Sequence, residues 1–333
     1  MRVLAITNMY PHPLQPTHGV FVEQQVLGLR RTGVDVEVVF IDRVTRGMRA
    51  YFDMDPPVDR ALGRHHVDVV HVMYGGIMAE RLLRRRWAQP VVVTFHGSDV
   101  FGENLSGWKR RAISYVGVMG SRHAARRATG VVAVSKVVAG ALPRSLDPKK
   151  VRIIPCGIDL DRFVPLDRAE CRRQLGWAPD HFHVLFPANA GDPVKRPELA
   201  AAAVSRLASA GVPVELHHLR GIPNSLVPQW LNASDALLLT SRHEGSPTVV
   251  KEALACNVAV VSVDVGDVAE RIQGIEGCHL AAPEADDLAA KLGLVAAAGA
   301  RVNSRAHIGS LSHLAVAHDL RRFYSELLGQ SHG

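Results

Sequence analysis

The sequence predicts an α/β protein with two Rossmann-like, doubly wound parallel sheets, one in each of two domains that face each other across a cleft. Short runs of β-branched residues alternate with helical patterns along almost the whole chain, which is typical of parallel strands joined by crossover helices. Several runs are apolar at every position, as strands covered by helices on both faces must be. The 333 residues suit two domains of about 150 residues each.

The strand pattern occurs in two blocks. In the first half, strands are expected at Val3–Thr7, Val34–Ile41, Val67–Met73, Val91–His96, Val131–Ser135 and Val151–Pro155. Segment 156–165 is rich in turn formers and lacks both periodicities, so it predicts the connection between domains. Strands are expected again at His183–Ala188, Pro213–Leu219, Ala236–Ser241, Val258–Asp264 and Cys278–Ala282, with helices such as Glu198–Ala210 and Asp286–Ala298 between them.

These blocks predict an N-terminal domain over residues 1–160, a C-terminal domain over residues 166–312 and a terminal helix over residues 313–330. Apolar residues recur in that last segment at helical spacing, namely Val316, Leu320, Phe323, Tyr324 and Leu327. A helix with this pattern buries one face. We expect that face to pack back on the N-terminal domain.

Charge is unevenly distributed along the chain. Residues 1–165 carry 24 Lys and Arg against 14 Asp and Glu, whereas residues 166–333 carry 15 against 18. This asymmetry favours an anionic surface or ligand as a partner of the first half, the alternative being a solvated basic face. No binding motif accompanies the charge, so nucleic acid is not expected as the partner.

The location expected from the sequence is the cytoplasm. The apolar run at the start is too short for a signal peptide, and no stretch of eighteen apolar residues predicts a membrane span. Cys156, Cys171, Cys256 and Cys278 lie far apart without metal-ligand spacing. They are expected as buried or free thiols in a reducing compartment.

The segment that carries most chemistry is 241–254, which reads SRHEGSPTVVKEAL and follows a predicted strand. A helix is expected from about Pro247, with Ser246 as its N-cap. The free amides and partial positive charge of a helix start suit a diphosphate. Glu244 and Glu252 lie at two depths beside it, where carboxylates can accept hydrogen bonds from sugar hydroxyls. The alternative is that both glutamates only favour and solvate the helix start.

The segment resembles the Glu-x7-Glu motif of retaining glycosyltransferases of family 4, which have the GT-B fold. Further matches occur in the family's order: Asp235 and Ser241 around the preceding strand, segment 256–262, the loop 265–268, and segment 157–163, which resembles the family's linker signature. The resemblance extends over most of the chain. Since context is what confirms a motif, it favours the functional interpretation of both glutamates.

The resemblance implies a role for each matching residue of the second half. Glu244 would contact hydroxyls of the donor sugar and Glu252 the ribose of the nucleotide. The backbone of Gly245, Ser246, Pro247, Thr248 and Val249 would line the sugar and the diphosphate. In the loop 189–197, Lys195 matches the family's lysine that neutralises the departing diphosphate, and Arg196 is its neighbour. The family's preceding arginine is replaced here by Asn189 or Ala190, and segment 220–227 is shorter than the family's base-reading region.

In the first half, His96 ends a predicted strand and begins a segment that resembles the family's His-Gly-x-Asp loop. The resemblance implies that His96 approaches the donor sugar near its reacting carbon, while Asp99 orients the loop or helps to fix the tautomer of His96. Gly19 resembles the glycine that lets the backbone approach the donor phosphate. Segment 74–76 is expected on the acceptor side. Asn8, His12 and His18 are alternative candidates for contact with the acceptor, and the sequence does not select among them.

The predicted function is therefore glycosyl transfer, with retention of configuration, from a nucleotide diphosphate sugar to a saccharide or lipid-linked acceptor in glycan or glycolipid biosynthesis. The resemblance implies no metal ion and no cofactor, with His96, Glu244 and Lys195 as the catalytic residues. A nucleotide-sugar 2-epimerase of the same fold and a non-catalytic sugar-binding protein are the alternatives. A nicotinamide-dependent dehydrogenase is disfavoured, because no G-x-G-x-x-G follows the first strand.

A peripheral position on an anionic membrane surface is a further hypothesis. Tryptophans stand beside cations in two segments, 81–87 and 108–111, and Arg122, Arg126 and Arg127 follow. Such pairs suit the headgroup region of a membrane, and each Lys or Arg near it is worth about 1 kcal/mol. The alternative is a soluble enzyme whose arginines are only solvated.

Overall fold

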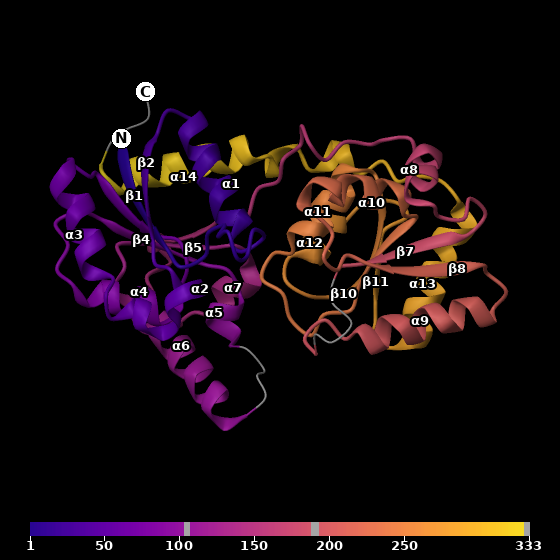
Figure 1. Ribbon diagram of the computed structural model, residues 1–333, viewed down its shortest axis with the longest axis horizontal. Coiled ribbons are helices and arrows are strands. Elements are labelled where there is room, and N and C mark those ends of the chain that lie inside the picture. Colours follow the sequence, from indigo (N-terminus) through magenta and orange to yellow (C-terminus); the bar gives the residue numbers. More distant parts are fainter. Residues whose placement is uncertain (103–106, 188–192, 330–333) are drawn as a thin grey trace. The chain divides into compact units, whose positions relative to one another are not determined.

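The computed structural model describes residues 1–102, 107–187 and 193–329, except for the side chain of Arg110. The chain forms two compact units (Figure 1). Unit 1 contains Met1–Gly157 and His313–Gly333, and unit 2 contains Ile158–Ser312. The chain therefore passes from one unit to the other twice.

Unit 1 is built on a parallel sheet with strand order β2-β1-β3-β4-β5-β6. The order reverses between β1 and β3, so the loops that follow these two strands diverge at that point. Two apolar clusters cover the two faces: Leu4 and Ile6 belong to one, and Val3 and Ala5 to the other. The strands are β1 (Arg2–Thr7), β2 (Asp35–Phe40), β3 (Val69–Val72), β4 (Val91–Phe95), β5 (Gly130–Ala133) and β6 (Val151–Ile153).

The helices of unit 1 include a pair formed by the two ends of the chain. α14 packs on α1, and a Cβ on Gly28 of α1 would lie 2.9 Å from the backbone oxygen of His313. The helices are α1 (Val20–Arg31), α2 (Arg43–Arg46), η1 (Gly47–Tyr51), α3 (Asp55–Arg64), α4 (Gly76–Arg84), α5 (Ser98–Phe101), α6 (Trp108–Arg127), α7 (Lys136–Ala141), η2 (Pro148–Lys150) and α14 (His313–Leu327).

Unit 2 contains a second parallel sheet, with strand order β11-β10-β9-β7-β8. Here the order reverses between β7 and β9. The strands are β7 (Phe182–Phe186), β8 (Val214–His218), β9 (Ala236–Leu239), β10 (Ala259–Val263) and β11 (His279–Ala281). The helices are α8 (Arg168–Leu175), α9 (Pro197–Ser209), η3 (Asn224–Leu226), α10 (Val227–Ala233), α11 (Thr248–Ala255), α12 (Val268–Ile272), α13 (Ala285–Ala298), η4 (Arg305–His307) and η5 (Gly309–Leu311).

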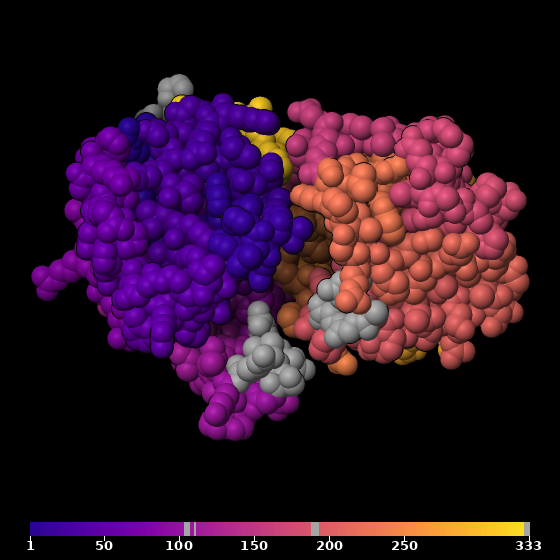
Figure 2. All heavy atoms as spheres, in the orientation of Figure 1, coloured from indigo at the N-terminus to yellow at the C-terminus, as the bar shows by residue number. Residues whose placement is uncertain are grey.

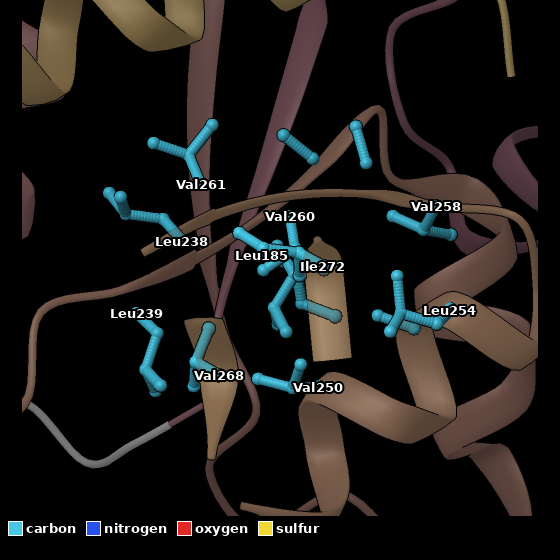
Figure 3. Packing of buried hydrophobic residues seen from close by; sticks show 14 of the residues in the cluster. Leu185, Leu238, Leu239, Val250, Leu254, Val258, Val260, Val261, Val268 and Ile272 are labelled. Carbon is cyan, nitrogen blue, oxygen red and sulfur yellow. The ribbon is translucent and has the colours of Figure 1, made fainter. Parts of the chain in front are cut away.

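The core of unit 2 fixes α11 against the sheet. Val250 and Leu254 lie one turn apart on the helix and belong to the same apolar cluster as Leu239 of β9 and Val260 of β10 (Figure 3). All four side chains are buried. This packing holds the first turn of α11 beside the carboxyl end of β9.

The eleven predicted strands are all present, and the fold class predicted from the sequence is confirmed. Most predicted strands extend one or two residues too far. Ser241 and Asp264, for example, lie in the loops after β9 and β10. Apolar residues next to them continue the hydrophobic run past the last residue that is hydrogen-bonded within the sheet. A prediction from hydrophobicity alone therefore overestimates the length of the strand. Ala188, the predicted end of one strand, lies outside the described residues.

Candidate functional site

The loops after β7 and β9 meet where the strand order of unit 2 reverses, which is where doubly wound sheets bind ligands. Lys195 follows β7, and its Nζ donates to Oε1 of Glu244, which follows β9, at 2.5 Å. The hydroxyl of Ser241 donates to the same oxygen at 2.7 Å. The Lys195 and Glu244 side chains stay 27% and 14% exposed. Two predicted site residues are therefore in contact and open to a ligand.

Arg196 helps to hold the Lys195 loop in place through hydrogen bonds to the residue that follows β9. Its backbone has φ 52°, a left-handed conformation at the start of α9. The guanidinium donates through Nε to the carbonyl oxygen of Thr240 at 2.5 Å. The Thr240 hydroxyl in turn donates to the carbonyl oxygen of Lys195 at 2.6 Å. Burial lowers the pKa of Arg196, and the nearby charge of Arg242 lowers it further. These bonds fix the Lys195 loop to the end of β9, and a direct contact of Arg196 with the donor stays a prediction.

The replacement of the family's arginine by Asn189 or Ala190 lies outside the described residues.

The start of α11 differs from the sequence prediction in one respect. Pro247 is the N-cap, with no side-chain cap bond, and the helix begins at Thr248. Ser246 was predicted to be the N-cap, and this is wrong because its hydroxyl donates instead to Oδ2 of Asp267 at 2.8 Å. The first amides of a helix have no partner within it, so those of Thr248 and Val249 can receive an anion.

A buried polar network that the sequence analysis missed holds this helix start. Lys251 is completely buried, and its Nζ donates to the Ser246 hydroxyl at 2.6 Å. Asp267, which accepts from Ser246, is also buried, and Arg271 lies 3.3 Å from its Oδ2. The signal in the sequence was a lysine on the apolar face of a helix, between Val250 and Leu254. Such a cation requires a buried hydrogen-bonding partner.

Gly266 lets the loop after β10 reach the same place. It has a φ of +58°, and a Cβ there would lie 2.9 Å from the carbonyl oxygen of Gly245. The Asp267 loop therefore packs directly on the turn that carries Glu244 and Gly245.

Glu252 lies one turn into α11 and is partly buried. Removal from water raises the pKa of its carboxyl to about 7, although the charges of Arg162 and Lys251 act in the opposite direction. Among the described residues, none forms a hydrogen bond with this carboxyl. A hydroxyl-bearing ligand is the kind of partner that would satisfy it.

In unit 1, Asp99 organises the loop that carries His96. Its carboxylate accepts from the backbone amides of Gly97 at 2.8 Å, of Gly75 at 3.0 Å and of His96 at 3.0 Å. Burial raises the pKa of Asp99 to about 6, while these amides lower it. Of the two roles expected for Asp99, the structure shows loop orientation.

The tautomer of His96 depends on other groups. Nε2 lies 3.1 Å from the carbonyl oxygen of Met73, which only accepts, so Nε2 carries the proton. Nδ1 lies 3.6 Å from Sγ of Cys156, and the ring stacks on Tyr74 at a centroid distance of 5.7 Å. The approach of His96 to a donor sugar stays a prediction.

Unit 1 has a cavity of about 170 Å³ at the point where its own strand order reverses. Asn8 after β1, Tyr74 and Gly75 after β3, and Ser98 after β4 line it, together with Arg43. Asn8 donates to the Tyr51 hydroxyl at 2.8 Å, and its own Oδ1 is buried with no partner in the described part of the chain. Of the three side chains expected on the acceptor side, Asn8 lines this cavity, whereas His12 and His18 do not.

Gly19 precedes α1 with φ +67°. A Cβ there would lie 2.2 Å from the carbonyl carbon of Met9, so the fold itself requires glycine. A contact between Gly19 and a donor phosphate stays a prediction.

Comparison with known proteins places the chain in a family. The model of Glycosyltransferase Family 4 matches residues 3–162, and that of Glycosyl transferases group 1 matches residues 184–297. The two matches follow each other along the chain and together cover most of it. The chain belongs to glycosyltransferase family 4. It is a glycosyltransferase, and both predictions are confirmed.

Proteins of similar sequence or structure support this assignment. A D-inositol 3-phosphate glycosyltransferase of Actinosynnema mirum is 26% identical over 90% of this chain and 89% of its own length. Sucrose-phosphate synthase of Thermosynechococcus elongatus is similar in structure, with a TM-score of 0.80, 19% identity, and coverage of 99% of this chain and all of the other. Alr3699/HepE of Anabaena, in complex with UDP-glucose, has a TM-score of 0.67 and 16% identity, with 97% of this chain and 99% of the other covered. These structures confirm the GT-B fold.

Proposed function

We propose that the enzyme transfers a sugar from a nucleoside diphosphate sugar to a saccharide or lipid-linked acceptor, with retention of anomeric configuration and without a metal ion. The observation that carries the proposal is the contact between Lys195 and Glu244 beside the open amides of α11. A cation, helix amides and a carboxylate meet there, and these are the groups that a diphosphate and a sugar hydroxyl require.

In this proposal the negative charge that develops on the departing diphosphate is stabilised by Lys195 and by the amides of Thr248 and Val249. Glu244 holds the sugar through its hydroxyls, and Glu252 holds the ribose of the nucleotide. The buried network of Ser246, Lys251 and Asp267 fixes the first turn of α11 in advance. The complex of the Anabaena protein with UDP-glucose supports a nucleotide sugar as the donor.

The proposed acceptor site is the cavity of unit 1. Asn8, Tyr74 and Ser98 present polar groups to it, and Arg43 adds a positive charge. This combination suits a hydroxyl-bearing acceptor that also carries an anionic group. The name of the Actinosynnema relative, D-inositol 3-phosphate glycosyltransferase, agrees with an anionic acceptor.

A peripheral position on the cytoplasmic face of a membrane stays part of the proposal, and the structure changes which residues support it. Arg85 forms ion pairs with Asp55 and Asp59, and the indole of Trp87 donates to the backbone of Leu82. These groups are engaged within unit 1 and are poor candidates for lipid contact. No helix in the described ranges is both long enough and apolar enough to span a bilayer.

Helix α6 offers better support for this position. Trp108 and Tyr115 are 76% and 66% exposed, and Ile113, Val116 and Met119 are also exposed. The first turns of α6 extend away from the body of unit 1 (Figures 1 and 2). The same helix also carries the cationic residues Lys109, Arg111 and Arg122. A helix with exposed aromatic, apolar and cationic side chains suits an anionic lipid surface.

A two-step experiment tests the transferase proposal. Nucleoside diphosphates and their sugars are first screened by thermal shift, because a ligand that binds the native state raises Tm. The best donor is then incubated with candidate acceptors, and the anomeric configuration of the product is read by NMR. Retention is expected. An inverted product would contradict the retaining mechanism, and conversion of the donor to a 2-epimer without acceptor would favour the epimerase.

A further inference from the structure

Unit 2 brings two histidines and a glutamate together at the edge of its sheet, at a distance from the site described above. His183 is the second residue of β7 and pairs in register with Glu215 of β8, while His217 lies two residues further along β8. Residues two apart in a strand point to the same face, so the three side chains share one face. Lys195 follows the carboxyl end of β7, whereas His183 lies near its amino end.

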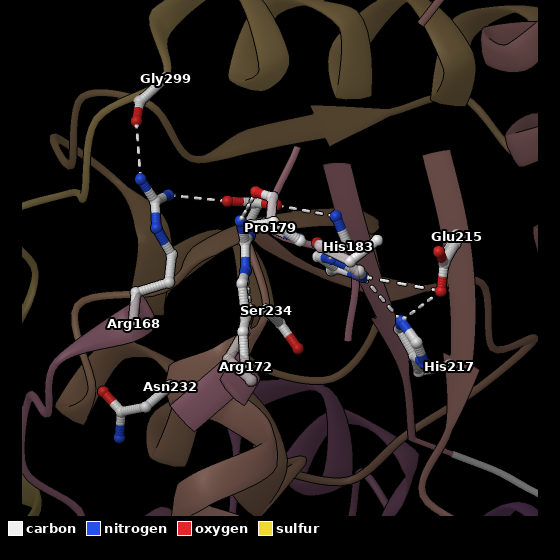
Figure 4. Close-up of polar contacts among 12 residues, drawn as sticks. Arg168, Arg172, Pro179, His183, Glu215, His217, Asn232, Ser234 and Gly299 are labelled. Atoms are coloured by element: carbon white, nitrogen blue, oxygen red, sulfur yellow. Dashed lines mark hydrogen bonds and ion pairs between the residues drawn. The ribbon is translucent and has the colours of Figure 1, made fainter. Parts of the chain in front are cut away.

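The three donor atoms have a separation that suits a metal ion. Nδ1 of His183 lies 2.8 Å from Nε2 of His217 and 4.0 Å from Oε2 of Glu215, and the latter two atoms are 3.6 Å apart (Figure 4). The point equidistant from all three lies inside the triangle that they form, at about 2.1 Å from each, which matches zinc bonds to imidazole and carboxylate of about 2.0–2.2 Å.

The hydrogen bond that His183 makes with the backbone leaves a lone pair on Nδ1, the atom that would bind the metal. His183 is buried, and its Nε2 lies 2.7 Å from the carbonyl oxygen of Ala178. A carbonyl only accepts, so Nε2 carries the proton and Nδ1 presents its lone pair to His217 and Glu215. Metal-bound histidines almost always donate their other N–H in this way.

Charge around the cluster permits a cation. Arg168 and Arg172, which line the same pocket as Glu215, both pair with Asp235, at 2.7 Å and 2.5 Å. In the described part of the chain, no arginine or lysine pairs with Glu215, whose side chain is 41% exposed. The negative charge of the Glu215 carboxylate, which lies beside the two imidazoles, is therefore not neutralised by an ion pair with any of these basic side chains. The exposed side of Glu215 also borders an open pocket with Trp177 and Arg173.

We propose that His183, Glu215 and His217 form a binding site for one divalent transition-metal ion of the zinc class, with a fourth position open to solvent. The bound ion ties the edge strand β8 to β7 and thereby stabilises unit 2. The site lies away from the residues proposed for glycosyl transfer, so it goes beyond the proposed function. The alternative is a plain hydrogen bond between two neutral histidines.

Titration of the tag-free protein, stripped with EDTA, with Co²⁺ and Zn²⁺ tests this proposal. We expect one ion per chain, a visible absorption band typical of tetrahedral Co²⁺, and a rise in Tm with Zn²⁺. Trp177 stacks on His217 at a centroid distance of 3.6 Å, so Co²⁺ should also quench tryptophan fluorescence. His217→Ala should abolish these signals, and Glu215→Gln, at a partly exposed position that the fold tolerates, should weaken binding at least tenfold.

His218→Ala is the matched control, because His218 is the next residue of β8 and its ring packs against Phe186 on the opposite face. It should bind Co²⁺ as the wild type does. The proposal is overturned if the wild type shows no one-to-one binding below 100 µM metal, or if His217→Ala and Glu215→Gln bind as tightly as His218→Ala. Those results would assign the cluster to a simple imidazole hydrogen bond.

Discussion

The hydroxyl of Tyr324 lies 2.6 Å from Nδ1 of His71, although 253 residues separate the two in sequence. Both side chains are completely buried, and Nε2 of His71 lies 2.6 Å from the Thr94 hydroxyl. A short polar chain thus runs from α14 through β3 to β4. Burial lowers the pKa of His71 to about 3, so its ring is neutral and can bond to both hydroxyls.

Tyr324→Phe should destabilise the protein by about 1–3 kcal/mol, because it leaves a nitrogen of buried His71 without a partner. The midpoint of urea unfolding measures this change. Tyr115→Phe, which removes the hydroxyl of an exposed tyrosine on α6, is the control and should have almost no effect. Equal midpoints for the two variants would show that the bond to His71 adds nothing to stability.

Glu244→Gln should lower kcat/KM by about ten- to a hundredfold, since a charge-assisted hydrogen bond is worth about 1.5–3 kcal/mol. Glutamine retains the size of the side chain but loses the ion pair with Lys195. Steady-state kinetics with the donor identified by thermal shift give the measurement, and circular dichroism checks the fold. A folded variant with wild-type kinetics would exclude Glu244 from the site.

Lys195→Ala should reduce kcat more than it raises KM, because the charge on the leaving diphosphate develops as the bond breaks. The double variant with Glu244→Gln should lose less than the product of the two single effects, since the residues are in contact. A change in KM alone would make Lys195 an ordinary binding residue.

Glu252→Gln should stabilise the protein relative to the wild type, increasingly as the pH rises from about 4.5 to about 7. The folded carboxyl has its pKa raised to about 7, so the folded wild type holds a proton that the unfolded chain releases above about 4.5. The wild type therefore loses stability across this window, and the glutamine variant does not. Tm measured from pH 4 to 8 tests this, with Glu276→Gln at an exposed position as the control. A constant difference in Tm would contradict the raised pKa.

Replacement of Trp108 and Tyr115 by serine should abolish co-sedimentation with anionic vesicles at low salt, whereas replacement of Arg85, which pairs with Asp55 and Asp59, should change it little. Binding of the wild type should require anionic lipid and weaken at high salt. Leu294→Ser, which removes an exposed leucine of unit 2, is the control. If the wild type stays in the supernatant, the membrane hypothesis is wrong.

The sequence predicts the fold well because strands such as β4 and β9 are buried on both faces and leave a continuous apolar signal. The resemblance to family 4 also implies Lys195 and Glu244 as residues of one donor site, and the structure brings the two side chains into contact. The bonds among Ser246, Lys251 and Asp267 depend on how two loops pack, which no spacing encodes. The cluster of His183, Glu215 and His217 depends on the register of β7 against β8, which becomes known only from the structure.

The return of α14 to unit 1 affects how the protein is made. Val316, Leu320 and Phe323 complete the apolar cluster that contains Val3 and Ala5. During translation, β1 leaves the ribosome long before these partners, because all of unit 2 is synthesised between them. About 310 residues separate Ala5 from Val316, so at about 5–20 residues per second that interval is on the order of 15–60 s. Unit 2 is continuous and can fold as it emerges, while the nascent N-terminal half waits with an exposed apolar face, a state in which chaperones bind and aggregation begins.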